Sequence, residues 1–306
     1  MNTILLTGAT GFIGSNIAST LIEHGFDVYA TYRTTSSFEK CKQFESKVKW
    51  INVDKQDWKE NIKRLKPMQL IHAAWGGIEA SSRNNWNQQI NNFWFSKELF
   101  DLAKEAGIRK VIALGSQAEY GAPGHSVDEE ASTNPEDAYG AVKLLTANYM
   151  QQLFQYTLSE WYWIRVFSFF GEGESQKWLI PMVISKLLKQ ETIKLTLCEQ
   201  RYNYLYIKDF TKQILKLVNC EYDKSGIYNL CNSEPVILKE FLIKITEIME
   251  TPQELLAFGE IPYRPRQNML ITGNNLKFHN SFNSDKVSYE LTAGLINTIE
   301  YYKKKL

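Results

Sequence analysis

The stretch Thr3–Gly14, TILLTGATGFIG, decides the fold of this chain. Its first five residues are an apolar run typical of a buried strand, and the apolar spacing of Phe12–Glu23 predicts a helix. Between the two, glycines let the backbone turn sharply and approach a pyrophosphate, while the helix N-terminus offers free N–H groups and a positive dipole. A glycine pattern in this position predicts a dinucleotide site. We expect its binding loop to comprise Gly8, Thr10, Gly11, Phe12, Ile13 and Gly14.

Short apolar runs and longer amphipathic segments alternate through the first half of the chain. This alternation, with continuous apolar strands, predicts an α/β fold in which helices cover both faces of a parallel sheet. The further expected strands lie at Val28–Tyr32, Val48–Val53, Leu70–Ala74, Lys110–Leu114 and Trp161–Phe167. The further expected helices lie at Asn84–Ala106 and Ala138–Tyr156.

After Gly171 the pattern is less regular and predicts a smaller lobe whose segments return to the main sheet. We expect residues 1–170, with 205–230 returning to them, to form the nucleotide-binding domain, and residues 171–204 and 231–306 to form the lobe. The expected helices are Lys177–Lys189, Asp209–Val218, Lys239–Glu250 and Ser288–Lys304, and the expected strands are Tyr204–Ile207 and Ile227–Leu230.

The composition argues against several classes of function. The formal net charge is +1 without any long run of one sign, so a nucleic-acid partner is not expected. The four cysteines are widely spaced and have no histidine cluster nearby, which predicts neither a disulfide framework nor a metal site. No segment reaches the roughly 18 apolar residues of a membrane span, and the N-terminus lacks the pattern of a signal peptide. We therefore expect a cytoplasmic protein.

The end of the second strand bears on the choice of dinucleotide. Enzymes that use NAD usually place Asp or Glu there to bind the ribose 2′-OH. In this chain the segment Thr31–Ser36 reads TYRTTS, and Asp27 lies at the opposite end of the strand. Arg33 supplies a planar cation that suits a 2′-phosphate. The pattern favours NADP(H), with NAD as the alternative if Arg33 is an ordinary surface charge.

Tyr139 and Lys143 lie four residues apart in a predicted helix, which places the phenol and the ammonium on one face. A tyrosine pKa near 10 must fall by roughly three units for proton exchange at neutral pH, and a neighbouring cation shifts it in that direction. Ser116 ends the fifth strand, at the edge where open α/β sheets bind ligands. Its hydroxyl can hydrogen-bond the substrate oxygen that Tyr139 protonates.

In combination, TGATGFIG, Ser116 followed by Tyr120–Gly121, and the Tyr139–Lys143 pair resemble the extended short-chain dehydrogenase/reductase family over essentially the whole chain. The resemblance implies a Rossmann-like, doubly wound sheet with a smaller C-terminal substrate-binding lobe. It implies that Ser116, Tyr139 and Lys143 are catalytic, and that the two long helices form the bundle of a homodimer, with packing in the core as the alternative for their apolar faces. The cofactor contacts that it implies, each with a structural role as alternative, are Asp54 near the adenine, Ala73 and Ala74 along the dinucleotide, and Asn92 near the lysine.

Substrates of this family are often nucleotide-linked sugars, and local matches favour that class here. Ser168 and Trp178 stand where relatives carry asparagine, and Arg264 matches an arginine that meets the pyrophosphate. A plain salt bridge is the alternative for Arg264. Tyr202 occupies the position of another family arginine and Arg201 precedes it, a slip that reverses the face of a strand. The substrate residues that the resemblance implies are Trp75, Gln117, Ser168, Trp178 and Arg264.

The reaction type follows partly from residues that are missing. Sugar dehydratases of the family carry an Asp-Glu pair after the catalytic hydroxyl, where this chain has Gln117 and Ala118. Epimerase–reductases of the family place a cysteine near the same loop, and this chain has no cysteine there. The reaction that remains is the transfer of one hydride and one proton at a single carbonyl group. This fits an NADPH-dependent 4-ketoreductase of a nucleotide-linked 4-keto-6-deoxysugar in surface-polysaccharide biosynthesis, and Phe258–Leu306 resembles the CDP-abequose type of synthase. A C4-epimerase with tightly bound NAD, a dehydrogenase running toward the ketone and a non-catalytic dinucleotide sensor are the alternatives.

Overall fold

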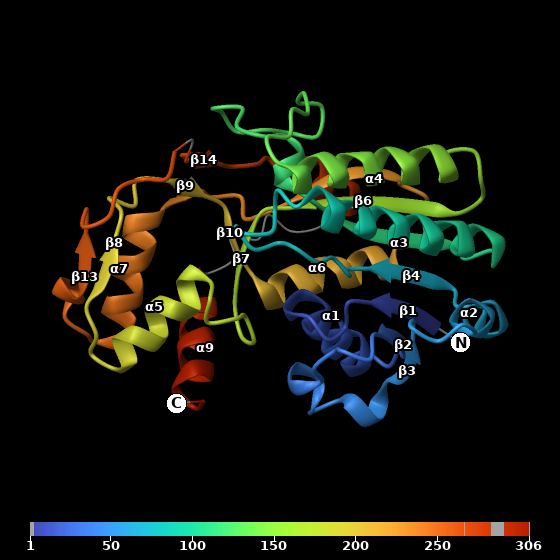
Figure 1. Cartoon of the computed structure of the whole chain (residues 1–306), viewed down its shortest axis with the longest axis horizontal. Coiled ribbons are helices and arrows are strands. Elements are labelled where there is room, and N and C mark those ends of the chain that lie inside the picture. Colours follow the sequence, from blue (N-terminus) through green and yellow to red (C-terminus); the bar gives the residue numbers. More distant parts are fainter. Residues whose placement is uncertain (1–2, 266, 283–290, 306) are drawn as a thin grey trace.

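The structure is a computed structural model that describes residues 3–265, 267–282 and 291–305. Within these residues, seven strands form one parallel sheet in the order β11-β6-β5-β4-β1-β2-β3. Helices lie on both faces of this sheet (Figure 1), which confirms the predicted Rossmann-like, doubly wound fold. The strands are β1 (Thr3–Thr7), β2 (Asp27–Tyr32), β3 (Lys49–Asn52), β4 (Gln69–His72), β5 (Lys110–Ser116), β6 (Glu160–Val166) and β11 (Gly226–Leu230).

Successive side chains of β1 enter two different hydrophobic clusters, one on each face of the sheet. Ile4 and Leu6 pack in the cluster that contains α1 and α6, whereas Leu5 packs in the cluster that contains α2, α3 and α4. A strand turns successive side chains to opposite faces, so an uninterrupted apolar strand needs cover on both. The covering helices are α1 (Phe12–Glu23), α2 (Trp58–Leu65), α3 (Trp86–Glu105), α4 (Ala138–Phe154) and α6 (Ile207–Asn219).

The smaller lobe occupies the left of Figure 1 and is built around three helices, α5, α7 and α9. Short strands at its surface pair with one another rather than with the main sheet. The expected last helix is described from Leu291, and residues 288–290 lie outside the described residues. The lobe helices are α5 (Leu179–Leu188), α7 (Leu238–Met249) and α9 (Leu291–Lys303), with a 3₁₀ turn at Gln253–Leu255. α8 (Leu276–Phe282) packs against β11 of the main sheet, and the other 3₁₀ turns, at Glu39–Cys41, Glu45–Lys47 and Gln117–Glu119, lie in the nucleotide-binding half. The strands are β8 (Ile193–Leu195), β9 (Arg201–Tyr202), β12 (Val236–Ile237), β13 (Leu256–Phe258) and β14 (Leu270–Ile271).

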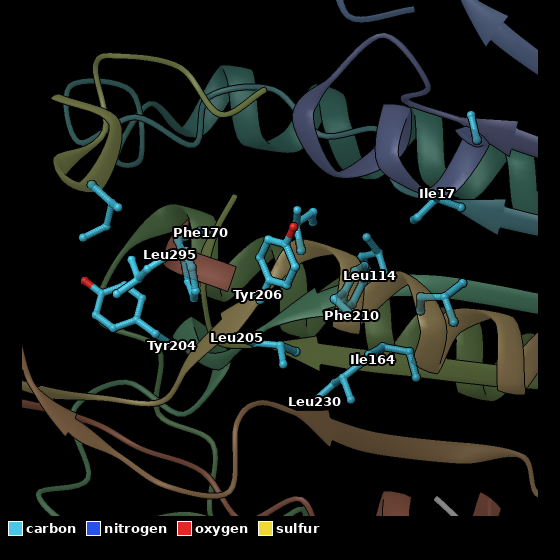
Figure 2. Packing of buried hydrophobic residues seen from close by; sticks show 14 of the residues in the cluster. Ile17, Leu114, Ile164, Phe170, Tyr204, Leu205, Tyr206, Phe210, Leu230 and Leu295 are labelled. Atoms are coloured by element: carbon cyan, nitrogen blue, oxygen red, sulfur yellow. The ribbon is translucent and has the colours of Figure 1, made fainter. Parts of the chain in front are cut away.

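The lobe and the sheet share one continuous apolar cluster. Between them β7 (Ser168–Phe170) pairs in parallel with β10 (Tyr204–Tyr206). Figure 2 shows Phe170 and Leu295 of α9 on the lobe side of this cluster, and Leu114 of β5 farther along it. The rings of Phe170 and Tyr206 lie 5.6 Å apart. Because these side chains are buried together, separating the lobe from the sheet would expose apolar surface to water, which is unfavourable.

Three helices, α3, α6 and α2, differ from what the sequence pattern predicts. α3 begins at Trp86 rather than Asn84, because the Asn85 side chain accepts a hydrogen bond from the Gln88 N–H at 3.1 Å and caps the helix. α6 begins at Ile207, directly after β10, two residues before the predicted start. The pattern gives no signal for α2, in which only Trp58 and Ile62 are buried. No helix among the described residues is both long and apolar enough to cross a bilayer.

Candidate active site

A cavity of about 760 Å³ lies between the carboxyl ends of the strands and the smaller lobe. Most of the residues expected to bind cofactor or substrate come together around it. Those that line it are Gly8, Gly11, Phe12, Ile13, Gly14, Ala73, Trp75, Ser116, Gln117, Tyr139, Lys143, Ser168, Trp178 and Arg264. The expected residues that are not among its lining are Thr10, Arg33, Asp54, Ala74 and Asn92.

The loop between β1 and α1 has no room for side chains at two of its glycines. Gly8 adopts a φ of +76°, and a Cβ there would lie 2.7 Å from the backbone nitrogen of Ala74. A Cβ on Gly14 would lie 2.1 Å from the carbonyl oxygen of Gly8. Gly11 is the N-cap of α1, and no side chain caps that helix end. The first N–H groups of α1 are therefore available to a phosphate, as the glycine pattern predicts.

Ser116, Tyr139 and Lys143 converge at the end of β5, and each is less than one tenth exposed. The Ser116 hydroxyl lies close enough to the Tyr139 phenol to lower its pKa. The Lys143 Nζ donates to the carbonyl oxygen of Leu114 at 2.6 Å and lies 3.6 Å from the centroid of the Trp75 ring. Its distance from the centroid of the Tyr139 ring is 5.9 Å. The serine and tyrosine hydroxyls can therefore hydrogen-bond the same substrate oxygen, close to the buried Lys143.

The electrostatics of Tyr139 differ from the expectation. Burial raises the pKa of its phenol, while the Ser116 hydroxyl and the charge of Arg83 act to lower it. The cation that we expected to lower this pKa was Lys143, but its Nζ is directed to Leu114 and Trp75 instead. Burial also lowers the pKa of Lys143 to about 7. Arg83 is thus a site residue that the sequence pattern did not reveal.

Glu119 is a second unpredicted residue of the site, and it fixes the backbone of Ser116. Its carboxylate is completely buried and accepts hydrogen bonds from the Ser116 N–H at 2.8 Å and from the Nε of Arg165 at 2.8 Å. Trp163 Nε1 donates to it at 2.9 Å. Ser116 and Glu119 form a capping box around the 3₁₀ turn, and the Ser-x-x-Glu spacing in the sequence could have indicated this contact.

Arg33 and Asp54 lie at the ends of β2 and β3, where the expected adenosine side of the cofactor begins. Both are exposed. Asp54 Oδ2 accepts a hydrogen bond from the Thr34 N–H at 2.7 Å, and this bond lowers the pKa of its carboxyl. The Arg33 guanidinium lies 5.8 Å from the centroid of the Phe95 ring. Asp54 therefore shapes the turn that follows Arg33 and leaves the guanidinium facing solvent.

Asn92 and Ala74 take part in the backbone frame around the cavity. The Asn92 side chain accepts from the Gly76 N–H at 3.0 Å and donates to the Gly76 carbonyl at 2.9 Å. The Ala74 N–H donates to the Thr7 hydroxyl at 3.2 Å. Both contacts hold the segment after β4, along which the resemblance places the dinucleotide. In this structure the Asn92 side chain holds that segment through both backbone groups of Gly76.

On the lobe side, Tyr202 lines the cavity, whereas the exposed Arg201 is not among its lining residues, as the one-residue slip predicts. The polar residues that line this side include Glu174 and Gln200. Burial raises the pKa of Glu174 to about 8. Gln200 is 4% exposed, and its Oε1 finds no hydrogen-bond partner within the described part of the chain. Gln200 begins the segment that contains Arg201 and Tyr202, whereas no sequence motif indicated Glu174.

The geometry defines a class of protein. A Rossmann-like sheet with a phosphate-binding glycine loop faces a buried serine, tyrosine and lysine across one cavity. Among the described residues, no group of three or more His, Cys, Asp or Glu side chains could hold a metal ion. The chain is an oxidoreductase of the short-chain dehydrogenase/reductase type, which uses a nicotinamide dinucleotide at a CH–OH or C=O group.

Comparison with known proteins identifies the family within this class. The sequence model of the NAD dependent epimerase/dehydratase family matches residues 4–231, and the chain belongs to this family. CDP-abequose synthase of Yersinia pseudotuberculosis is 24% identical over 294 residues, covering 95% of this chain and 98% of that protein. dTDP-4-dehydro-6-deoxyglucose reductase of Escherichia coli is 22% identical over 284 residues, covering 88% of each. The structure of UDP-glucuronic acid 4-epimerase from Bacillus cereus, in complex with UDP-glucuronic acid and NAD, matches with a TM-score of 0.87 at 17% identity, covering 99% of this chain and 100% of that one.

Proposed function

We propose that this enzyme is an NADPH-dependent 4-ketoreductase of a nucleotide-linked 4-keto-6-deoxysugar, working in surface-polysaccharide biosynthesis. The observation that carries the proposal is the convergence of Ser116, Tyr139 and Lys143 with the glycine loop on a single cavity. The two curated relatives described above support the substrate class, because one is a nucleotide-deoxysugar reductase and the other a CDP-sugar synthase.

The residues at the sheet edge fit a dinucleotide. Gly8 and Gly14 leave the space that a Cβ would otherwise fill, and the uncapped start of α1 offers N–H groups to the pyrophosphate. The exposed guanidinium of Arg33 would bind a 2′-phosphate, which supports NADPH over NADH. The bound nicotinamide would supply the hydride. Lys143, which lines the same cavity, would hold its ammonium near Tyr139, with its Nζ 5.9 Å from the centroid of the phenol ring.

The proton that the reduction needs would come from the protein's own residues. Tyr139 would donate its hydroxyl proton to the substrate's C4 oxygen as the carbonyl becomes an alcohol. Ser116 would hold the same oxygen by a hydrogen bond, with its backbone fixed by Glu119. Gln117 and Ala118, next along the chain, carry no acid or base, so elimination of water is not supported. The reaction therefore stops at reduction of one carbon.

A second candidate is a nucleotide-sugar C4-epimerase that retains NAD. The observation that favours it is the close structural match to an epimerase complexed with NAD and a UDP-sugar. The same serine, tyrosine and lysine would serve both reactions. The two differ in whether the dinucleotide is consumed, and that can be measured directly.

The test is NADPH oxidation by the purified enzyme against a panel of nucleotide-4-keto-6-deoxysugars with different nucleotides, run beside NADH. Stoichiometric NADPH consumption with one ketosugar, lost in Tyr139→Phe while NADPH binding is retained, is the expected result. Interconversion of C4 epimers without net cofactor consumption, with NAD released only on denaturation, would establish the epimerase. Dinucleotide binding without turnover of any substrate would indicate a sensor.

We also propose that the enzyme is a homodimer formed through α3 and α4. These helices pack side by side and carry large exposed apolar side chains, Trp86 at 56%, Trp94 at 55% and Leu145 at 43% exposure. Exposed aromatic groups of this size are commonly buried at interfaces. Light scattering of the wild type and of Trp94→Glu tests this proposal. A monomeric wild type would contradict it.

A further inference from the structure

Tyr139 has two basic neighbours, and the nearer one is not the lysine of its own helix. The Cζ of Arg83 lies 4.3 Å from the centroid of the Tyr139 ring, whereas the Nζ of Lys143 lies 5.9 Å from it. A guanidinium at that distance is within the range of a cation–π contact. Arg83 also lines the cavity, so its charge is beside the phenol on the side where the reaction would take place.

The loop that carries Arg83 is hydrogen-bonded to the start of α4. The Tyr139 N–H donates to the Arg83 carbonyl at 3.0 Å, and the Arg83 Nε donates to Asp137 Oδ2 at 2.7 Å. Asp137 Oδ1 accepts from the Gly140 N–H at 2.7 Å, so the same carboxylate caps the helix. The first turn of α4 therefore fixes both the tyrosine and the arginine beside it.

The same loop is anchored to α3 by a buried amide. Gln89 has no exposed surface, and its Nε2 donates to the Gly77 carbonyl at 2.8 Å and to the Ser82 carbonyl at 3.4 Å. Its Oε1 accepts from the Trp75 Nε1 at 2.9 Å. With both ends of the loop held, Arg83 keeps one position over the Tyr139 ring. Its side chain is also only 29% exposed in the ion pair with Asp137.

The charged groups around Tyr139 come from every element packed against it. The cations are Arg83 from the loop and Lys143 from α4, and the anions are Glu119 from the 3₁₀ turn and Asp137 from the helix cap. The two anions and burial raise the pKa of the phenol, while Arg83 and the Ser116 hydroxyl lower it. Without Arg83 the anions would therefore act on a buried phenol with one fewer opposing charge.

We propose that Arg83 is a positioning residue of the reaction and that it sets the acidity of Tyr139 by holding a cation against its ring. This inference rests on the proposed function. When the phenol gives its proton to the substrate oxygen, the phenolate that remains is stabilised by the adjacent guanidinium more than the neutral phenol is. Arg83 keeps all of its own protons throughout, because a guanidinium does not titrate in proteins.

The experiment compares Arg83→Gln, which removes the charge, with Arg83→Lys, which keeps it. Arg109→Gln is the matched control, an exposed arginine directly before β5 that is not among the lining residues of the cavity. Tyrosine carrying a carbon isotope at Cζ reports the ionisation of Tyr139 by NMR, in enzyme saturated with oxidised dinucleotide. The resonance is assigned by its loss in Tyr139→Phe.

In Arg83→Gln we expect the pKa of Tyr139 to rise by about one unit, which is the size of a single neighbouring charge. Arg83→Lys should recover more than half of this shift, and Arg109→Gln should show none. In the reductive direction the protonated phenol is the active form, so the alkaline limb of the kcat profile should move upward with the same pKa. A Tyr139 titration that does not move in folded Arg83→Gln overturns the proposal.

Two outcomes keep this inference separate from the function that it rests on. If the wild type turns over no nucleotide sugar, the proposed function fails, and the resonance titration still decides the role of Arg83. If Arg83→Gln does not fold, Arg83→Met keeps apolar packing over the ring without the charge. The same upward shift is expected in that variant, and an unchanged titration would again overturn the proposal.

Discussion

The Nζ of Lys143 lies 3.6 Å from the centroid of the Trp75 ring, and the Trp75 indole is held by its hydrogen bond to Gln89. A buried ammonium is unfavourable without compensation, and here burial lowers the pKa of Lys143 to about 7. The indole face and the Leu114 carbonyl are the groups that compensate the charge. Trp75 is thus placed to decide how much of the lysine is charged at neutral pH.

Replacing the indole by an aliphatic side chain tests this relationship. A desolvated cation–π contact contributes about 2 kcal/mol, so Trp75→Leu should lower the pKa of Lys143 by roughly one and a half units. Lys143 would then lose its proton at a lower pH. The limb of the kcat/KM profile that reflects the ionisation of Lys143 should therefore shift to lower pH. Trp75→Phe, which keeps an aromatic face, should lie close to the wild type. A limb at the same pH in Trp75→Leu would show that the indole does not stabilise the charge.

The buried carboxylate of Glu119 should be essential for stability. Glu119→Gln keeps its size but leaves Arg165 as an unpaired charge that is only 3% exposed. Breaking a buried ion pair from one side costs about 3–5 kcal/mol. The urea midpoint should therefore fall sharply, whereas Glu130→Gln, at an exposed position nearby, should leave it unchanged. A stable Glu119→Gln enzyme would mean that the Arg165 charge is neutralised by another group.

Glu174 predicts a particular dependence of stability on pH. Folding raises the pKa of its carboxyl from 4.5 to about 8. The contribution of this neutral carboxyl to stability is complete below pH 4.5 and declines until about pH 8, because the unfolded chain releases the proton first. Glu174→Gln removes the effect. Its melting temperature should match the wild type at about pH 4.5 and exceed it near pH 9.

The control for Glu174 is Glu191→Gln, which is exposed. Melting curves of the three proteins across this pH range give the comparison. The assignment is wrong if the difference between Glu174→Gln and the wild type stays constant over the range, since a group that ionises equally in both states adds no pH dependence.

Arg33 should decide between the two dinucleotides. A charge-assisted hydrogen bond to a phosphate contributes about 1.5–3 kcal/mol, so Arg33→Ala should weaken NADPH binding by roughly tenfold to a hundredfold. NADH has no 2′-phosphate, and its affinity should change little. Fluorescence titration of both cofactors measures the ratio, with Lys55→Ala as an exposed neighbouring cation for control. Equal weakening of both cofactors would contradict a 2′-phosphate contact.

The sequence was informative where local pattern and fold agree. β1 and α1 have the bounds that the apolar pattern predicts, because a buried strand and an amphipathic helix each carry their own periodicity. Strands such as β9 and β14, of two residues each, are defined only by their pairing and leave no such trace. Arg83 lies 56 positions before Tyr139, so its role became visible only when the fold brought the two together.

The route of the chain through the sheet has a consequence for its synthesis. β11 pairs with β6, and α6 packs against α1, yet both follow the first excursion into the lobe. A nascent polypeptide ending near residue 170 would present the unpaired edge of β6 and an uncovered apolar face beside α1. The main sheet can therefore be completed only after residue 230 has been synthesised, and until then the N-terminal half exposes an unpaired strand edge and apolar surface of the kind that promotes aggregation.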